Sequence, residues 1–150
     1  MDGNFRPAKL FGNANKMIEA YHAALQPICK ESGIPPLALD ILLFIANNPE
    51  NATAKEICKF RGFKSGIVSV HIERMAAGGL IERAEVPEDR RKTLLKATEE
   101  AQPIVERGRD VQKKFGERLL TRLTEEDISA VRSAMRVIEG NIENILKNGL

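Results

Sequence analysis

Hydrophobic positions recur at helical spacing along the first part of the chain. Between Leu10 and Ile28 they lie three or four residues apart, which predicts an amphipathic helix over about residues 8–32. A proline pair that ends at Pro36 leads into Leu37–Ala46, where apolar residues are nearly continuous. Such a segment predicts a second helix that is buried on most sides.

Two shorter helical patterns follow, separated by a tight turn at residues 61–64. Thr53 and Glu56 have the spacing of a capping box, in which each side chain binds the amide of the other residue, so they predict the start of the first helix. Ser65 is placed to cap the second helix, and the glycines at 78–79 are placed to end it. The inward positions of this second helix are predicted to be Val68, Ile72 and Met75. Two helices joined in this way predict a helix-turn-helix, a shape that reads DNA.

The pattern changes after these glycines. Leu80–Val86 and Thr93–Lys96 have the composition of strands, and the acidic-then-basic segment 87–92 is predicted to turn between them. A hairpin that follows two short helices is the wing of a winged helix-turn-helix.

A long helix over about residues 99–120 is expected next. Pro103 near its start removes an amide donor, and Gly108 and Gly116 interrupt the helical pattern. We therefore expect this helix to bend or to start late.

A last helix is predicted within about residues 120–147. Thr124 is placed to cap it, and the three acidic residues that follow favour the positive end of a helix dipole. Its apolar residues alternate between steps of three and four: Ile128, Val131, Met135, Ile138, Ile142 and Ile145. Such a heptad seam fits either a partner helix in a dimer or packing on its own domain.

The hairpin region also resembles a known family. The run Gly79–Arg83, the triplet Asp89-Arg90-Arg91 and Thr98 resemble the MarR family of bacterial transcriptional regulators, and the resemblance covers essentially the whole chain. It implies a mainly α protein with a small β-wing, in which a winged helix-turn-helix core at about residues 36–98 is flanked by N- and C-terminal dimerisation helices. In the family a Leu-Thr-x-x-Gly motif follows the wing. Here Ala97 and Ala101 replace its Leu and its Gly, so an atypical start of the long helix is expected.

The resemblance implies roles for the wing and for a second subunit. Asp89 and Arg91 match a family pair in which the Arg enters the DNA minor groove and the Asp orients it. A homodimer would hold two recognition helices one DNA turn apart on a palindromic operator. Family members are commonly repressors released by a small-molecule effector, so a regulator of this kind is expected here, with double-stranded DNA as its partner.

The candidate DNA contacts lie on the second short helix and on the wing. They are Lys64, Ser65, Gly66, Ser69, Val70, Arg74, Asp89, Arg90, Arg91 and Lys92. The serines can donate to phosphates or base edges, Gly66 allows close backbone approach, and Val70 could meet a thymine methyl. Lys59, Arg61 and Lys64 could hold phosphates. The outward helix face is poor in charge, which leaves open an alternative: a winged-helix dimer that acts through protein contacts without specific DNA binding.

Charge and composition agree with a single globular domain. The 150 residues are 43% hydrophobic and 29% charged, and the formal net charge is only +2. Residues 55–96 carry ten Lys or Arg against six Asp or Glu, a surplus of four positive charges in the segment that would face DNA.

Other classes of function find little support. The chain has no glycine-rich phosphate loop and no nucleophile or zinc-protease motif, and its two Cys and two His are isolated, so no enzyme activity, cofactor or metal is predicted. Cys29 and Cys58 are expected to be buried thiols, although a resemblance to oxidant-sensing members leaves a redox role for Cys29 open. Both histidines are expected to be packing or partly exposed residues; as alternatives, His71 could hydrogen-bond DNA, and His22 with Tyr21 could border an effector pocket. Residues 1–7 have no apolar targeting core and no segment is long enough to cross a bilayer, so a cytoplasmic protein is expected.

Overall fold

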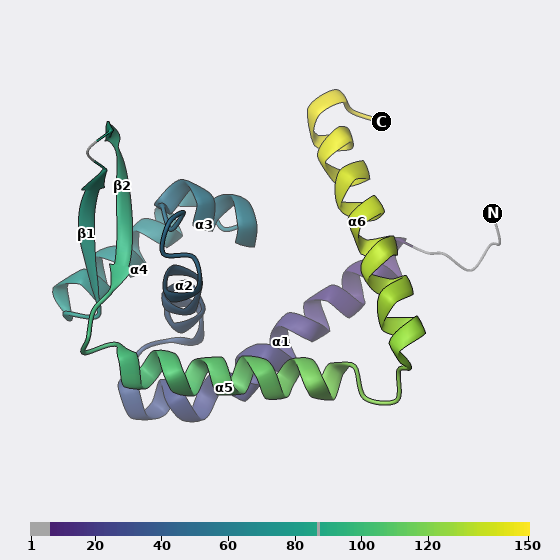
Figure 1. Cartoon of the computed structure of the whole chain (residues 1–150), viewed down its shortest axis with the longest axis horizontal. Coiled ribbons are helices and arrows are strands. Elements are labelled where there is room, and N and C mark those ends of the chain that lie inside the picture. Colours follow the sequence, from purple (N-terminus) through teal and green to yellow (C-terminus); the bar gives the residue numbers. More distant parts are fainter. Residues whose placement is uncertain (1–6, 87) are drawn as a thin grey trace. The chain divides into compact units, whose positions relative to one another are not determined.

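The computed structural model describes residues 7–86 and 88–150. The helices and strands within these ranges are α1 (Pro7–Ser32), α2 (Pro36–Asn47), α3 (Ala54–Arg61), α4 (Ser65–Ala77), β1 (Ile81–Val86), β2 (Asp89–Ala97), α5 (Gln102–Leu119) and α6 (Glu125–Asn148), as Figure 1 shows. The chain forms two compact units, one that ends at Lys113 and one from Lys114 to Leu150. Two predictions fall on residues outside the described ranges. The absence of a targeting segment concerns mainly residues 1–6, and the predicted wing turn includes Pro87.

Helix α2 forms the centre of the first unit. Seven of its residues are buried, as its continuous apolar pattern predicts. Side chains from the other elements of this unit pack around it. The largest fully buried side chains are Leu39, Ile41, Leu42, Leu43 and Ile45 of α2 itself, with Leu25, Ile57, Val68 and Val105 from four other helices. The core therefore joins α1 and α5 to the helix-turn-helix.

The caps of α3 and α4 differ from the sequence prediction in detail. Thr53 Oγ1 accepts from the Glu56 amide at 3.2 Å. The Thr53 amide, however, donates to the Asn51 carbonyl at 2.9 Å, so the reciprocal half of the predicted capping box is wrong. The N-cap of α4 is Lys64 and not Ser65, because the Lys64 carbonyl already accepts from the Val68 amide at 3.2 Å.

The predicted inward face of α4 is confirmed. Val68, Ile72 and Met75 are buried. Gly79, with φ of +76°, adopts the left-handed conformation that suits glycine, and the Leu80 amide then bonds the Met75 carbonyl at 2.9 Å. The helix therefore ends where the glycines predict.

The wing is a two-stranded antiparallel hairpin in which Ile81 pairs with Ala97 and Val86 with Asp89. The prediction that residues 89–92 form a turn is wrong, because β2 already begins at Asp89. Val86 pairs with Asp89 at the tip of the described hairpin. The Leu95 amide donates to the Ala52 carbonyl at 2.8 Å, which ties β2 to the segment before α3. In Figure 1 the hairpin projects away from α5.

Helix α5 starts late, as expected, at Gln102. Pro103 is its second residue, a position where an amide donor is not required. Thr98 holds the chain before it: its hydroxyl donates to the Gly79 carbonyl at 2.6 Å and accepts from the Ala101 amide at 3.3 Å. The helix is continuous to Leu119, so the predicted interruption at the glycines is wrong.

Gly108 on α5 is buried against α2. A Cβ atom built on it would lie 2.5 Å from Leu43 Cδ2. The glycine therefore permits a close approach of two helices and does not break one.

The second unit contains α6. Thr124 and Asp127 form a full capping box: the Asp127 amide donates to Thr124 Oγ1 at 3.1 Å, and the Thr124 amide donates to Asp127 Oδ2 at 2.9 Å. These hydrogen bonds hold the pKa of Asp127 below its usual value. No residue of this helix is buried, and its apolar seam includes Met135 at 58% exposure and Ile142 at 52%.

Within the described ranges, no helix combines the length and the apolar character that crossing a membrane requires.

Candidate nucleic-acid interface

The N-terminal half of α4 presents a small polar face. Ser65, Gly66, Ser69 and Val70 are all exposed, and their spacing places them on or beside the side of the helix that faces away from the buried stripe. Lys64 stands at the N-cap of the same helix. The structure therefore brings together these five residues of the predicted contact set. The first turn of α4 contains no acidic residue, and a helix N-terminus of this kind attracts phosphate.

The other end of this face borders the wing. Glu73 lies one turn after Ser69, and its carboxylate accepts from Arg83 of β1 at 2.5 Å. Both partners of this pair are exposed, so its contribution to stability is small. Its geometric consequence matters more, since it shows that the outward side of α4 and β1 are neighbours.

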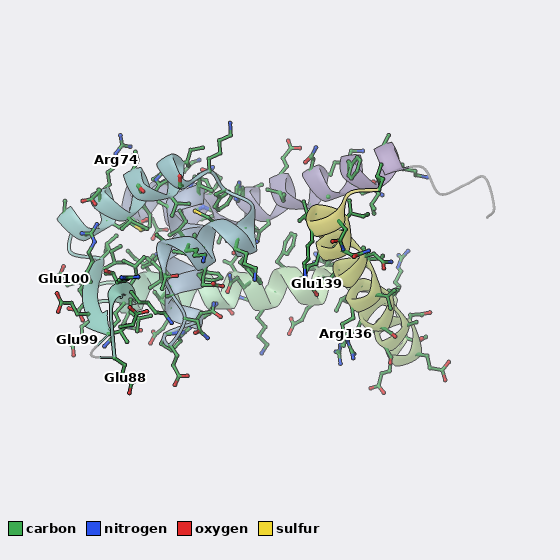
Figure 2. The ribbon with its side chains drawn as sticks, turned by 90° about the horizontal axis from the view of Figure 1, so that it is seen from above. Arg74, Glu88, Glu99, Glu100, Arg136 and Glu139 are labelled. Carbon is green, nitrogen blue, oxygen red and sulfur yellow. The ribbon has the colours of Figure 1, made fainter. Side chains whose placement is uncertain are left out.

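Arg74 is separated from the N-terminal group. It lies in the last turn of α4, and its labelled side chain points away from the ribbon in Figure 2. With His71 it borders a cavity of about 370 Å³ that is also lined by the α1–α2 loop and Ile104 of α5. A contact with phosphate from Arg74 would therefore come from the far end of the helix.

His71 belongs to this cavity, as packing predicts. It is half-buried, and burial together with the nearby charge of Arg74 holds its pKa below the usual value. Both causes favour the neutral imidazole, which can accept or donate a hydrogen bond.

The wing presents a second basic group. Asp89 Oδ1 accepts from the backbone amide of Arg91 at 3.0 Å, which fixes the start of β2. Arg91 is exposed, and none of the ion pairs among the described residues involves its guanidinium. The contact of Asp89 is thus with the main chain of Arg91. Arg90 lies in β2 as well, but its side chain is outside the described part.

An open groove of about 870 Å³ connects this part of the wing to α3. Arg91, Lys92 and Asp89 line one side, and Thr53 and Lys55 at the start of α3 line the other. The predicted contact residues of the wing therefore lie next to the first helix of the helix-turn-helix.

Arg61 has a partner within the protein that the sequence did not predict. Its guanidinium bonds the carboxylate of Asp40 on α2, which is only 5% exposed. Asp40 was not singled out from the sequence. The signal was present, because it is the single charged residue within the apolar segment Leu37–Ala46, and a buried carboxylate requires a cationic or hydrogen-bonding partner.

The cysteines and the remaining histidine give little evidence of chemistry. Cys29 is buried, and burial raises the pKa of its thiol, which opposes the thiolate form that oxidants attack. His22 is half-buried in α1 near the Tyr21 ring, with 6.0 Å between the ring centroids. The described residues contain no group of three or more His, Cys, Asp or Glu that could hold a metal ion.

Two short helices, the second with an exposed polar face, followed by a basic hairpin, define a winged helix-turn-helix protein. The model of the MarR family matches residues 32–92, which include α2, α3, α4, β1 and the start of β2. Over this part of its length the chain is similar to the MarR family, and the curated relatives that it resembles are HTH-type transcriptional regulators.

Individual relatives are distant. The chain is 27% identical over 104 residues to the HTH-type transcriptional repressor IacR of Pseudomonas putida. This match covers 69% of this chain and 62% of that protein. It is 23% identical over 114 residues to the uncharacterized HTH-type transcriptional regulator YdgJ of Bacillus subtilis, covering 76% of this chain and 69% of that protein. The match thus spans about two thirds of the length of these relatives.

A solved structure shares the fold over nearly the whole chain. It is a MarR family transcriptional regulator from Listeria monocytogenes complexed with 26mer DNA, with a TM-score of 0.78 and 17% identity, covering 97% of this chain and 96% of that chain.

Proposed function

We propose that this protein is a sequence-specific DNA-binding regulator that binds a palindromic operator as a homodimer. In this proposal the N-terminal half of α4 enters the major groove, where Ser65, Ser69 and Val70 meet base edges and phosphates. The wing places Arg91 in the adjacent minor groove, where the narrow, negative groove attracts an arginine. Arg74, Arg90 and Lys92 add phosphate contacts.

The observation that carries the proposal is the neighbourhood of these two surfaces. The exposed face of α4 borders the wing through the Glu73–Arg83 pair, and Arg91 has no carboxylate partner among the described ion pairs. The Listeria monocytogenes regulator of the same fold is complexed with DNA. An exposed serine-rich helix face beside an exposed arginine suits a duplex better than it suits a small substrate.

Dimerisation follows from the unpartnered apolar seam of α6. Val131, Met135, Ile142 and Ile145 are between 45% and 58% exposed, and they repeat at heptad spacing. Leu10, Phe11, Met17 and Ile18 of α1 are likewise exposed. Exposed apolar side chains at heptad spacing support an interface in which another chain covers them. A dimer is also required for a palindromic site, since one recognition helix covers only a few base pairs.

We further propose repression that a small-molecule effector relieves. The name of the Pseudomonas putida relative, a transcriptional repressor, supports this sign of regulation. An effector lowers DNA affinity only if it binds a conformer of the dimer that does not match the operator. The protein would act in the cytoplasm, where its operator is accessible.

The test is fluorescence anisotropy with DNA from upstream of the protein's own gene and with sequences selected from a randomised pool. Binding should weaken steeply as salt is raised, because each neutralised phosphate releases a counterion. Arg91→Ala should weaken binding by about tenfold or more, which corresponds to about 1.4 kcal/mol. Arg107→Ala, which removes the same charge from the exposed face of α5, is the matched control and should bind as the wild type does.

A second candidate function is suggested by the apolar residues on the recognition helix. Ile67 and Val70 are 45% and 48% exposed, and no Lys or Arg lies between Ser65 and Glu73. A winged-helix dimer that acts through protein contacts would use such a face. Failure of the wild type to bind the upstream DNA and the randomised pool alike would favour this second function.

A further inference from the structure

Polar side chains between the helices of the first unit form a connected set, which runs from the buried Asp40 to Asn47 and Arg109 at the surface. The guanidinium of Arg61 on α3 bonds the Asp40 carboxylate on α2. The Tyr21 hydroxyl on α1 lies close enough to Asp40 to feel its charge, and it accepts from Gln112 Nε2 on α5 at 2.9 Å. Burial, with the charge of Asp40, raises the pKa of Tyr21, so its hydroxyl keeps its proton.

The set continues along α5. Asn47 Nδ2 donates to Gln112 Oε1 at 3.1 Å, and Arg109 Nε donates to Asn47 Oδ1 at 2.8 Å. Arg109 also donates to the Ala46 carbonyl at 2.9 Å, which fixes the end of α2. We call this set the polar chain, and its members are Tyr21, Asp40, Asn47, Arg61, Arg109 and Gln112.

The position of Arg61 gives the polar chain its significance. Arg61 is the last residue of α3, and Gly62 after it takes the left-handed conformation with φ of +66°. The ring of Phe63 lies 5.8 Å from the Arg61 guanidinium carbon. Ser65 then begins α4. One arginine thus anchors the turn from which the recognition helix starts.

Stability alone does not account for this arrangement. Burying a carboxylate carries a desolvation penalty, and a hydrophobic pair of similar volume is often at least as stable. Buried ion pairs are retained in some proteins because they select one geometry among several packings. The Asp40 side chain is 5% exposed and that of Arg61 27%, so this cost applies mainly to Asp40.

We propose that Tyr21, Asp40 and Arg61 are positioning residues that set the orientation of α4 relative to α1. This inference rests on the proposed function, because orientation matters when a dimer must place two recognition helices on two half-sites. Half-sites lie about one helical turn apart, so the angle of each α4 selects the spacing that the dimer accepts. The polar chain restricts α4 to one angle and thereby makes the protein selective for one half-site spacing.

The consequence for binding is specific. When the polar chain is broken, α3 and α4 can adopt several angles relative to α1. Affinity for the preferred operator falls because only part of the population matches it. Affinity for operators of other spacing falls less or rises. A merely structural role would lower binding to every spacing by the same factor.

The experiment uses the full-length protein and a series of operators whose half-site spacing differs by single base pairs. Tyr21→Phe removes only the hydroxyl, and Asp40→Asn removes only the charge. Arg107→Ala is the matched control, since Arg107 pairs with Glu31 and so joins α5 to α1 as the polar chain does, but at the exposed surface. Affinities come from anisotropy, and circular dichroism with sedimentation confirms fold and dimer.

A third variant separates positioning from stability. Asp40→Leu combined with Arg61→Met replaces the ion pair by apolar side chains, which should preserve folding. We expect Asp40→Asn and this double variant to bind the preferred spacing about tenfold more weakly, with a much smaller difference between spacings. Tyr21→Phe should show the same change to a lesser degree, and Arg107→Ala should match the wild type.

Two results would overturn the inference in different ways. If the wild type and all folded variants show the same spacing preference, the polar chain does not position α4, while the proposed function stands. If the wild type binds no operator at any spacing, the proposed function fails and this inference fails with it.

Discussion

Substitution of Gly108 by alanine tests how closely α5 must approach α2. A Cβ at this position would lie 2.5 Å from Leu43 Cδ2, 2.9 Å from Cδ1 and 3.1 Å from Cγ. Rotation about χ2 of Leu43 moves its methyl groups and leaves Cγ in place, whereas rotation about χ1 would move the whole side chain into a neighbour, because Leu43 is fully buried in a closely packed core. Relief requires the two helices to separate.

The size of the effect follows from two opposing terms. Overpacking a well-packed core costs about 1–3 kcal/mol. Alanine in a helix interior gains roughly 0.5–1 kcal/mol over glycine. The free energy of unfolding of Gly108→Ala should therefore fall by up to about 2.5 kcal/mol.

Gly116 on the same helix is the matched control. A Cβ built there meets no described atom within 4 Å, so Gly116→Ala should gain the helical term alone. The two variants should differ by about 1–3 kcal/mol, or roughly 2–12 °C in Tm for a chain of this size. Thermal unfolding followed by circular dichroism at equal protein concentration measures this difference, because Tm of a dimer depends on concentration.

A double-mutant cycle identifies the clash itself. Leu43→Ala removes the atoms that Cβ would meet, at its own cost of about 2–5 kcal/mol. In that background Gly108→Ala should no longer destabilise. Equal stability of Gly108→Ala and Gly116→Ala, or a cycle without coupling, would refute the close approach of α2 and α5.

Three further predictions concern the helix caps and the α6 seam. Thr53→Ala should lower the free energy of unfolding by about 1 kcal/mol in a denaturant titration, because it removes the single side-chain cap of α3; an unchanged midpoint would contradict this cap. Asp127 has a folded pKa below its unfolded one, so its stabilisation is present above the unfolded pKa and is lost as pH falls through the folded pKa. In Asp127→Asn the free energy of unfolding should therefore depend less on pH over this range. The same pH dependence in the variant and the wild type would contradict the prediction. Met135→Glu should shift the sedimentation coefficient toward that of the monomer, since it places a charge in the exposed seam. If the variant remains dimeric, α6 is not part of the dimer interface.

The periodic elements could be predicted from the sequence because each leaves a local signature. The buried stripe of α4, the apolar run of α2 and the cap at Thr124 depend on residues within a few positions of one another. The start of β2 could not be located in this way. Asp89 and its neighbours are polar, as residues in a turn usually are. Asp89 is a strand residue because it pairs with Val86 across the hairpin.

The site divides along the same line. The exposed serines of α4 and the exposed Arg91 lie where local pattern places them. The role of Arg61 was missed because its partner is 21 positions away in the chain, and charge in a turn next to a recognition helix resembles a phosphate contact until that partner is known. Gly108 was misjudged for a similar reason, since a glycine in a helix looks like a weak point when its neighbour Leu43 is unseen.

These two errors point to the same property of α2. Helix α2 packs closely against Gly108 of α5, and its Asp40 forms an ion pair with Arg61 of α3. A core of branched aliphatic side chains tolerates small shifts between helices, because such contacts have little directional preference. An ion pair tolerates such shifts poorly because it needs hydrogen-bond geometry, and a close contact at a glycine tolerates them poorly because it needs a fixed separation between the helices. The orientation of the recognition helix is therefore fixed through α2 by its few non-aliphatic contacts, and these are the positions where single substitutions should alter DNA recognition while the fold is retained.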